Sequence, residues 1–142
     1  MWPFRSKTQK KLDALQKIVN ARRLVLAAAL EVSKRTGGEF ERLGPLLSDE
    51  ARGAFVLAQG QCGYFIGALL DDVTTADESI QDLRVVTGLG NGQNPMLIAE
   101  QLAGTERRLA QSEQTCRSLG LACTLMAHAV GLCTTMGNAH QP

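Results

Sequence analysis

Hydrophobic residues recur at helical spacing near the start of the chain. Their side chains lie three, four or seven positions apart, as one buried helical face requires. These positions are Leu12, Leu15, Val19, Leu26 and Ala29, and the face is widened by Ile18, Val25 and Leu30. The pattern predicts one long helix over residues 6–36, and the glycine pair that follows at 37 and 38 predicts its end.

The second apolar stretch covers residues 48–70 and begins like a helix. Ser48 suits the N-cap, and Asp49 and Glu50 suit the positive end of the helix dipole. No charge follows from Ala54 to Leu70. The stretch therefore predicts a helix that is unusually poor in polar side chains.

Glycines recur inside this predicted helix, and each costs about 1 kcal/mol relative to alanine. Gly53, Gly60 and Gly67 are seven apart, and Gly63 lies between them, so the four share one helical face. A face without side chains allows another backbone to approach closely. We therefore expect a packing seam here, with Gly60, Gly63 and Gly67 as its contact residues.

The remaining pattern is broken by acidic residues and by a loop. Asp71-Asp72 predicts the end of the glycine-bearing helix, and a shorter helix is expected over residues 76–86. The run TGLGNGQNP predicts a loop, from which Asn94 and Pro95 begin a new helix as N-cap and first residue. That helix is expected over residues 95–136, either continuous or divided at its internal glycines.

Composition favours packing of helix against helix. The 142 residues suffice for one domain, and the chain is 44% hydrophobic but only 4% aromatic. We expect a single all-α domain over residues 1–142, an elongated antiparallel bundle of three to five helices, two of them long.

Charge is uneven along a chain whose net charge is only +1. Residues 1–30 carry seven basic side chains and one acidic one, whereas residues 71–84 carry five acidic and one basic. The two segments are expected to pair with each other, either within one molecule or between two copies. Alternatively, the basic segment binds an anion from outside the protein.

The N-terminal tail, residues 1–5, carries two large rings beside the basic cluster. Trp2 and Phe4 either cover an edge of the core or serve as anchors in a partner or at a membrane interface. Lys7, Lys10 and Lys11 would then guide an anionic partner. No apolar signal-peptide core precedes them, and four cysteines are too few for a disulfide scaffold, so a cytoplasmic location is expected.

Candidate chemistry is sparse. The GLGNG run has neither the register nor the flanking strand of a dinucleotide-binding turn. On a helix, Cys116 and Cys123 share a face, but His128 and Cys133 point elsewhere, so no metal site is predicted. No nucleophile elbow accompanies the two histidines. We expect no catalytic residue, metal or cofactor.

The sequence thus favours a non-enzymatic assembly, structural or adaptor protein that acts through helix packing, as a homo-oligomer or within a larger complex. A component of a bacterial or bacteriophage assembly would suit such a chain. A membrane-associated hairpin that uses residues 54–70 and 119–136 is the main alternative, since both runs approach the length that spans a bilayer. Nucleic-acid binding by the basic first helix is a further alternative.

Overall fold

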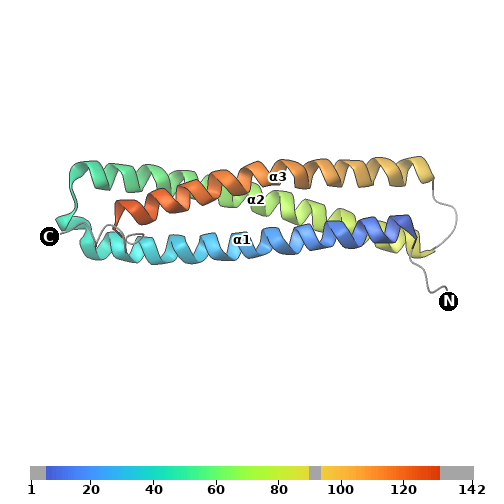
Figure 1. The fold of residues 1–142 in the computed structure, drawn as a ribbon, viewed down its shortest axis with the longest axis horizontal. Helices are drawn as coiled ribbons and strands as arrows, with labels where there is room; N and C mark the ends of the chain where they lie inside the picture. Colours follow the sequence, from blue (N-terminus) through green and yellow to red (C-terminus); the bar gives the residue numbers. More distant parts are fainter. Residues whose placement is uncertain (1–5, 90–93, 132–142) are drawn as a thin grey trace.

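The computed structural model describes residues 6–89 and 94–131. This part of the chain forms three long helices, α1 (Lys7–Leu43), α2 (Asp49–Leu89) and α3 (Pro95–Ala129), and no strand. A short 3-10 helix, η1 (Gly44–Leu46), connects α1 to α2. The helices pack lengthwise into an elongated bundle (Figure 1). The predicted all-α fold class is therefore confirmed.

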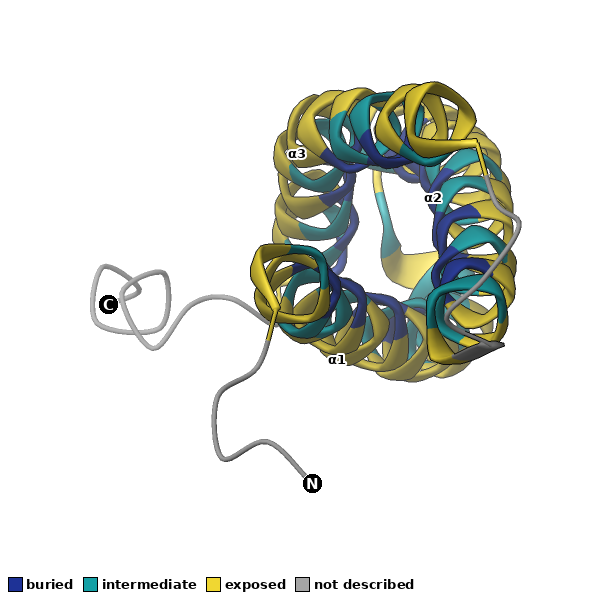
Figure 2. Ribbon diagram, turned by 90° about the vertical axis from the view of Figure 1, so that its right-hand side faces the viewer, coloured by how far each residue is buried: buried dark blue, intermediate teal, exposed yellow. Residues whose placement is uncertain are grey.

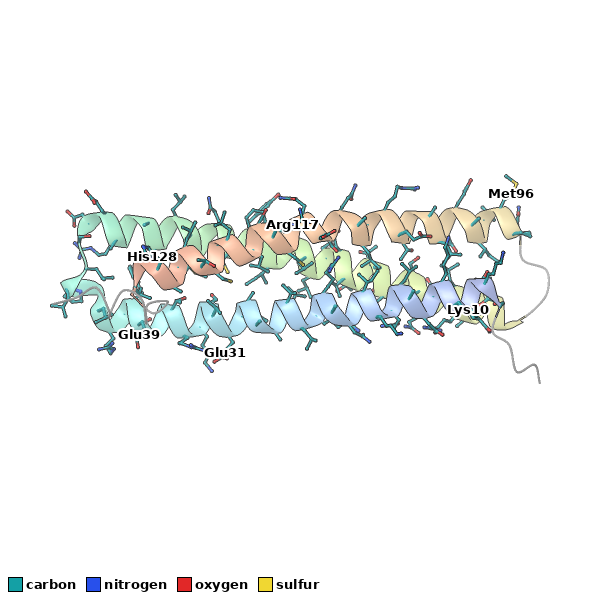
Figure 3. The ribbon with its side chains drawn as sticks, in the orientation of Figure 1. Lys10, Glu31, Glu39, Met96, Arg117 and His128 are labelled. Atoms are coloured by element: carbon teal, nitrogen blue, oxygen red, sulfur yellow. The ribbon has the colours of Figure 1, made fainter. Side chains whose placement is uncertain are left out.

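Helices α1 and α3 run parallel to each other and antiparallel to α2. Lys10 of α1 and Met96 of α3 lie at one end of the bundle, and Glu39 of α1 and His128 of α3 lie at the other (Figure 3). The N-terminal half of α2 therefore lies beside the C-terminal halves of the other two helices.

The core is a continuous apolar seam along the axis of the bundle (Figure 2). The five main apolar positions predicted for the first helix are buried, and Ile18 and Val25 pack against them, but Leu30 is exposed. Each helix contributes residues at spacings of three and four, because only one face of a 3.6-residue helix can point inward. The largest fully buried members from α2 and α3 are Phe55, Leu69, Ile80, Leu83, Leu109, Leu119 and Met126.

The predicted end of the first helix at Gly37-Gly38 is wrong, since α1 continues to Leu43. Packing beyond the glycines explains the extension. The ring of Phe40 stacks on that of Phe55 of α2, with centroids 4.2 Å apart. Burial of this ring pair offsets the roughly 1 kcal/mol that each glycine costs.

The predicted division of the middle segment into helices over 48–70 and 76–86 is also wrong, since α2 is one helix from Asp49 to Leu89. Buried residues continue at spacings of three and four through Leu69, Val73 and Ala76. Asp72 lies in mid-helix, where Arg108 of α3 pairs with it at 3.1 Å. The two aspartates therefore never meet the negative end of a helix dipole.

The third helix begins as predicted, with the Met96 amide donating to the Asn94 side chain at 2.9 Å and Pro95 in the first turn. It passes through Gly104 and Gly120 undivided. It ends at Ala129, short of the predicted end near Met136, and residues 132–136 of the predicted helix lie outside the described residues. Gly131 there has a positive φ of 77°, a conformation that terminates helices.

Ion pairs between helices gather in the half of the bundle that holds the start of α1. Arg23 of α1 pairs with Asp77 of α2 at 3.2 Å, and Arg84 of α2 pairs with Asp13 of α1 at 3.0 Å. The basic and acidic segments thus meet within one molecule. The other half, around residues 54–70 of α2, is held by apolar contacts and by the stacked rings.

Candidate interaction surface on α2

The four glycines of α2 do not face a neighbouring helix. All four are exposed, and a Cβ atom added at any of them would meet no other atom within 4 Å. The seam expected at Gly60, Gly63 and Gly67 therefore packs against no other helix of the described chain. The core is instead formed by larger residues on the opposite face of α2, such as Cys62 and Leu69.

The exposed glycines belong to a wider uncharged face, which we call the α2 stripe. Three large apolar side chains lie between them at helical spacing, with exposed fractions of 57% for Val56, 66% for Leu57 and 72% for Tyr64. The stripe thus comprises Gly53, Val56, Leu57, Gly60, Gly63, Tyr64 and Gly67. It runs for about 20 Å along the helix, and no charged residue interrupts it.

The three large residues of the stripe were missed when the sequence was interpreted from its glycines alone. A signal for them was present, because Val56, Leu57 and Tyr64 fall at helical spacing relative to Gly60. A helix face that carries both glycines and exposed apolar residues resembles a contact surface more than a core face. Periodicity alone does not tell the two faces apart, since both are uncharged.

A second exposed apolar patch lies near the C-terminal end of α3. Leu121 and Leu125 are exposed there. The uncharged runs of α2 and α3 lie at the same end of the bundle. By length and composition, α2 (over Asp49–Gly88) is the one described helix that could cross a membrane, and only 22% of its apolar window is buried.

The three predicted guide lysines lie together in the first turns of α1. Lys7, Lys10 and Lys11, with the apolar Leu102 of α3, line a groove of about 570 Å³. Lys11 is partly neutralised by Glu106 at 3.1 Å. The groove lies at the opposite end of the bundle from the α2 stripe, so the predicted lysines and glycines form no common site. Trp2 and Phe4 lie outside the described residues.

Burial raises the pKa of all three cysteines within the described residues. Burial raises the pKa of Cys62 to about 12, and the adjacent Cys123 adds to the shift. Burial likewise raises the pKa of Cys123, while a hydrogen bond from Cys62 lowers it. Burial also raises the pKa of Cys116, which the Arg22 guanidinium opposes.

No group of three or more histidine, cysteine or carboxylate side chains gathers around a common point within residues 6–89 and 94–131. Cys133, one of the four residues considered as metal ligands, lies outside this part of the chain. The same described region leaves no buried side-chain nitrogen or oxygen without a hydrogen-bond partner. The α2 stripe is therefore the candidate functional site in this part of the chain.

Comparison of the sequence with protein-family models finds no matching family, and comparisons with curated proteins and with solved structures find no similar chain.

Proposed function

We propose that this protein is a non-enzymatic assembly protein that self-associates, with the α2 stripe as the contact between copies. The exposure of Val56, Leu57 and Tyr64 beside four open glycines carries the proposal. Soluble monomers rarely expose long contiguous apolar surfaces, and those that do generally use them for binding.

The glycines support an intermolecular role because, within the described residues, a side chain at any of them would meet open space. Four of them in one helix cost about 4 kcal/mol relative to alanine, at about 1 kcal/mol each. The bundle itself would accommodate a methyl group at each position, since every added Cβ meets open space. Close approach of a second molecule is a physical reason for the missing side chains.

A second copy of the same helix fits the stripe. If two α2 helices cross antiparallel at Gly60, Leu57 of one copy lies opposite Gly63 of the other. Gly53 then lies opposite Gly67, because each pair is equally far from Gly60 along the chain. Leu57 thus meets a glycine on both sides of the two-fold axis, and Val56 of each copy meets Tyr64 of the other. Such self-complementarity is what a symmetric dimer interface requires.

Charges at the ends of the stripe are compatible with this crossing. Asp49 and Asp71 flank it, and both are well exposed. Helices that touch at glycines cross at roughly 40° and diverge on either side. The like charges therefore stay in solvent, and the contact remains limited to the uncharged stretch between them.

The test is the mass of the protein in solution, measured by light scattering over a range of concentrations. We expect a dimer or a larger oligomer for the unmodified chain. Gly63→Leu should shift it to monomer, because the new side chain occupies the space that Leu57 of the other copy requires. Gly38→Leu is the matched control, since Gly38 is also an exposed helical glycine with open space around it but lies on α1.

A monomeric mass for the unmodified chain at all concentrations would contradict the proposal. Equal loss of association in Gly63→Leu and Gly38→Leu would contradict the assigned surface. Circular dichroism of both variants separates these results from unfolding, because a folded bundle retains its helical signal.

Membrane association is the second candidate, and the exposed apolar length of α2 favours it. The stripe would then face lipid, and the neighbouring Leu121 and Leu125 of α3 would widen the contact. Flotation with neutral and with anionic vesicles tests this candidate, and protein that stays at the bottom of both gradients rules it out.

The variant Gly60→Ala distinguishes self-association from membrane association. The added methyl group obstructs close helix packing but does not weaken partition into lipid.

A further inference from the structure

The groove at the start of α1 combines cationic side chains with an apolar lining. Helix α1 contributes Lys7, Thr8, Lys10, Lys11 and Ala14, and Leu102 lines the groove from α3. The surface that faces the groove is mostly apolar, although half of these residues are lysines. Lysine side chains lay their methylene stems along apolar surface and keep their ammonium groups at its edge. The groove therefore has an apolar interior below a cationic rim.

Charge and apolar surface are separated along this groove. Lys7, Lys10 and Lys11 are three and four positions apart, so they share one face of α1. Lys10 lies at the end of the bundle (Figure 3), and Ala14 continues the same face one turn further in. Leu102 is only 7% exposed, so it forms the floor of the groove rather than its edge. A bound molecule therefore meets cations at one end and hydrocarbon at the other.

Two carboxylates on the helices that form the groove are already paired. Glu106 of α3 lies 3.1 Å from the Lys11 ammonium group, and Asp13 of α1 pairs with α2 at 3.0 Å. Within the described residues, neither Lys7 nor Lys10 takes part in an ion pair. The three lysines and Glu106 together leave the groove with two net positive charges. Charge complementarity thus favours a ligand with two negative charges.

We propose that this groove binds a single-chain lipid anion with a phosphate head group. A phosphate monoester carries a charge of about −1.5 to −2 at neutral pH, which matches the charge of the groove. Its oxygens accept charge-assisted hydrogen bonds from the ammonium groups of Lys7 and Lys10. The hydrocarbon chain covers Ala14 and Leu102 and removes their apolar surface from water. The volume of about 570 Å³ lies within the range of roughly 300–1,000 Å³ that small-molecule sites occupy.

The shape of the groove favours one free amphiphile over a bilayer surface. A bilayer presents many head groups at once and suits a protruding basic surface. Here the apolar surface is recessed, with Leu102 nearly buried at its floor. The site lies at the opposite end of the bundle from the α2 stripe, so it goes beyond the proposed self-association and is tested separately from it.

The experiment is calorimetric titration of the full chain with decyl phosphate below its critical micelle concentration. Inorganic phosphate tests the head group alone, and decyl maltoside tests the chain with an uncharged head group. We expect saturable binding of one decyl phosphate per chain, with both other probes at least about tenfold weaker. Backbone amide shifts should change over residues 7–14 and around Leu102, and should stay constant over residues 53–67.

The double variant Lys7→Gln with Lys10→Gln should weaken decyl phosphate binding about tenfold or more, because both charged donors are lost. The matched control is Lys34→Gln with Arg35→Gln, which removes two charges from exposed positions elsewhere on α1. These positions lie about 36 Å from Lys10 along the helix, well beyond the Debye length of about 8 Å at physiological salt. The control should therefore retain the affinity of the unmodified chain.

Four results would overturn the proposal. The first is equal affinity for inorganic phosphate and decyl phosphate, and the second is equal affinity in the lysine variant and its control. The third is a set of amide shifts centred on the α2 stripe, which would place the amphiphile there. The fourth is flotation with vesicles that contain phosphatidic acid, without saturable binding of free decyl phosphate, which would assign the groove to a bilayer surface.

Discussion

The guanidinium of Arg22 reaches from α1 to α3, where its Nε donates a hydrogen bond of 2.9 Å to the Oγ of Ser112. Ser112 is fully buried, and its own hydroxyl donates to the Leu109 carbonyl at 2.6 Å. Arg22 lies between the buried Val19 and Leu26 of α1, and this hydrogen bond pairs its charged group at the helix interface.

Ser112→Ala should lower the free energy of unfolding by about 1–2 kcal/mol, because the Arg22 N–H loses its acceptor at a half-buried position. Urea denaturation measures the effect. Arg22→Met alone and combined with Ser112→Ala completes a double-mutant cycle, in which the pair should show a coupling energy clearly above zero. Strict additivity would show that the hydrogen bond contributes nothing.

Gly60→Ala should change stability and association in opposite directions. The alanine should stabilise the helix by about 1 kcal/mol, since it meets no neighbouring atom within the bundle. The same methyl group should weaken the dimer by obstructing the approach of the second copy. Chemical denaturation at low protein concentration measures the first effect, and light scattering measures the second. Gly38→Ala serves as the control and should stabilise without affecting the mass.

Phe40→Ala should release the last turns of α1. Without the stack on Phe55, little holds the helix together beyond Gly37-Gly38, and we expect it to end at the glycines. Hydrogen exchange of the amides between residues 38 and 43 should become much faster, while exchange around Leu15 and Val19 stays slow. Equal acceleration along the whole helix would contradict this local role.

Phe55→Ala tests the other partner of the stack. Phe55 is fully buried, so its truncation should cost about 3–5 kcal/mol. Phe40 is only partly buried, and its truncation should cost less. The difference is measurable by urea denaturation of the two variants under identical conditions.

Stability should fall at alkaline pH through Cys62. Burial raises the pKa of this thiol from 9.0 to about 12. Between these values the unfolded chain has lost the proton and the folded chain retains it, so the free energy of unfolding decreases as pH rises. Below pH 8 both states are protonated, and the thiol contributes no pH dependence. The decline between pH 9 and pH 12 should be shallower in Cys62→Ala, as chemical denaturation at each pH will show.

The sequence by itself determined the helical class and the buried face of the first helix. The spacing of Leu12, Leu15 and Val19 requires one face of a helix to be buried, whatever the rest of the chain does. The start of α3 is equally local. The Asn94 side chain accepts a hydrogen bond from a free amide of the first turn, and Pro95 has no amide hydrogen that needs an acceptor, so neither residue depends on a distant partner.

Only the tertiary structure decided how far the helices extend and what the glycines face. Gly37-Gly38 and Asp71-Asp72 are local signals for a helix end, and contacts with distant residues overrule them, through Phe55 in one case and Arg108 in the other. A face of glycines can point toward a neighbouring helix or toward solvent with the same periodicity. The larger apolar residues on the opposite face of α2 form the core instead. Packing these side chains between the helices buries more apolar surface than close contact between glycine-bearing backbones would.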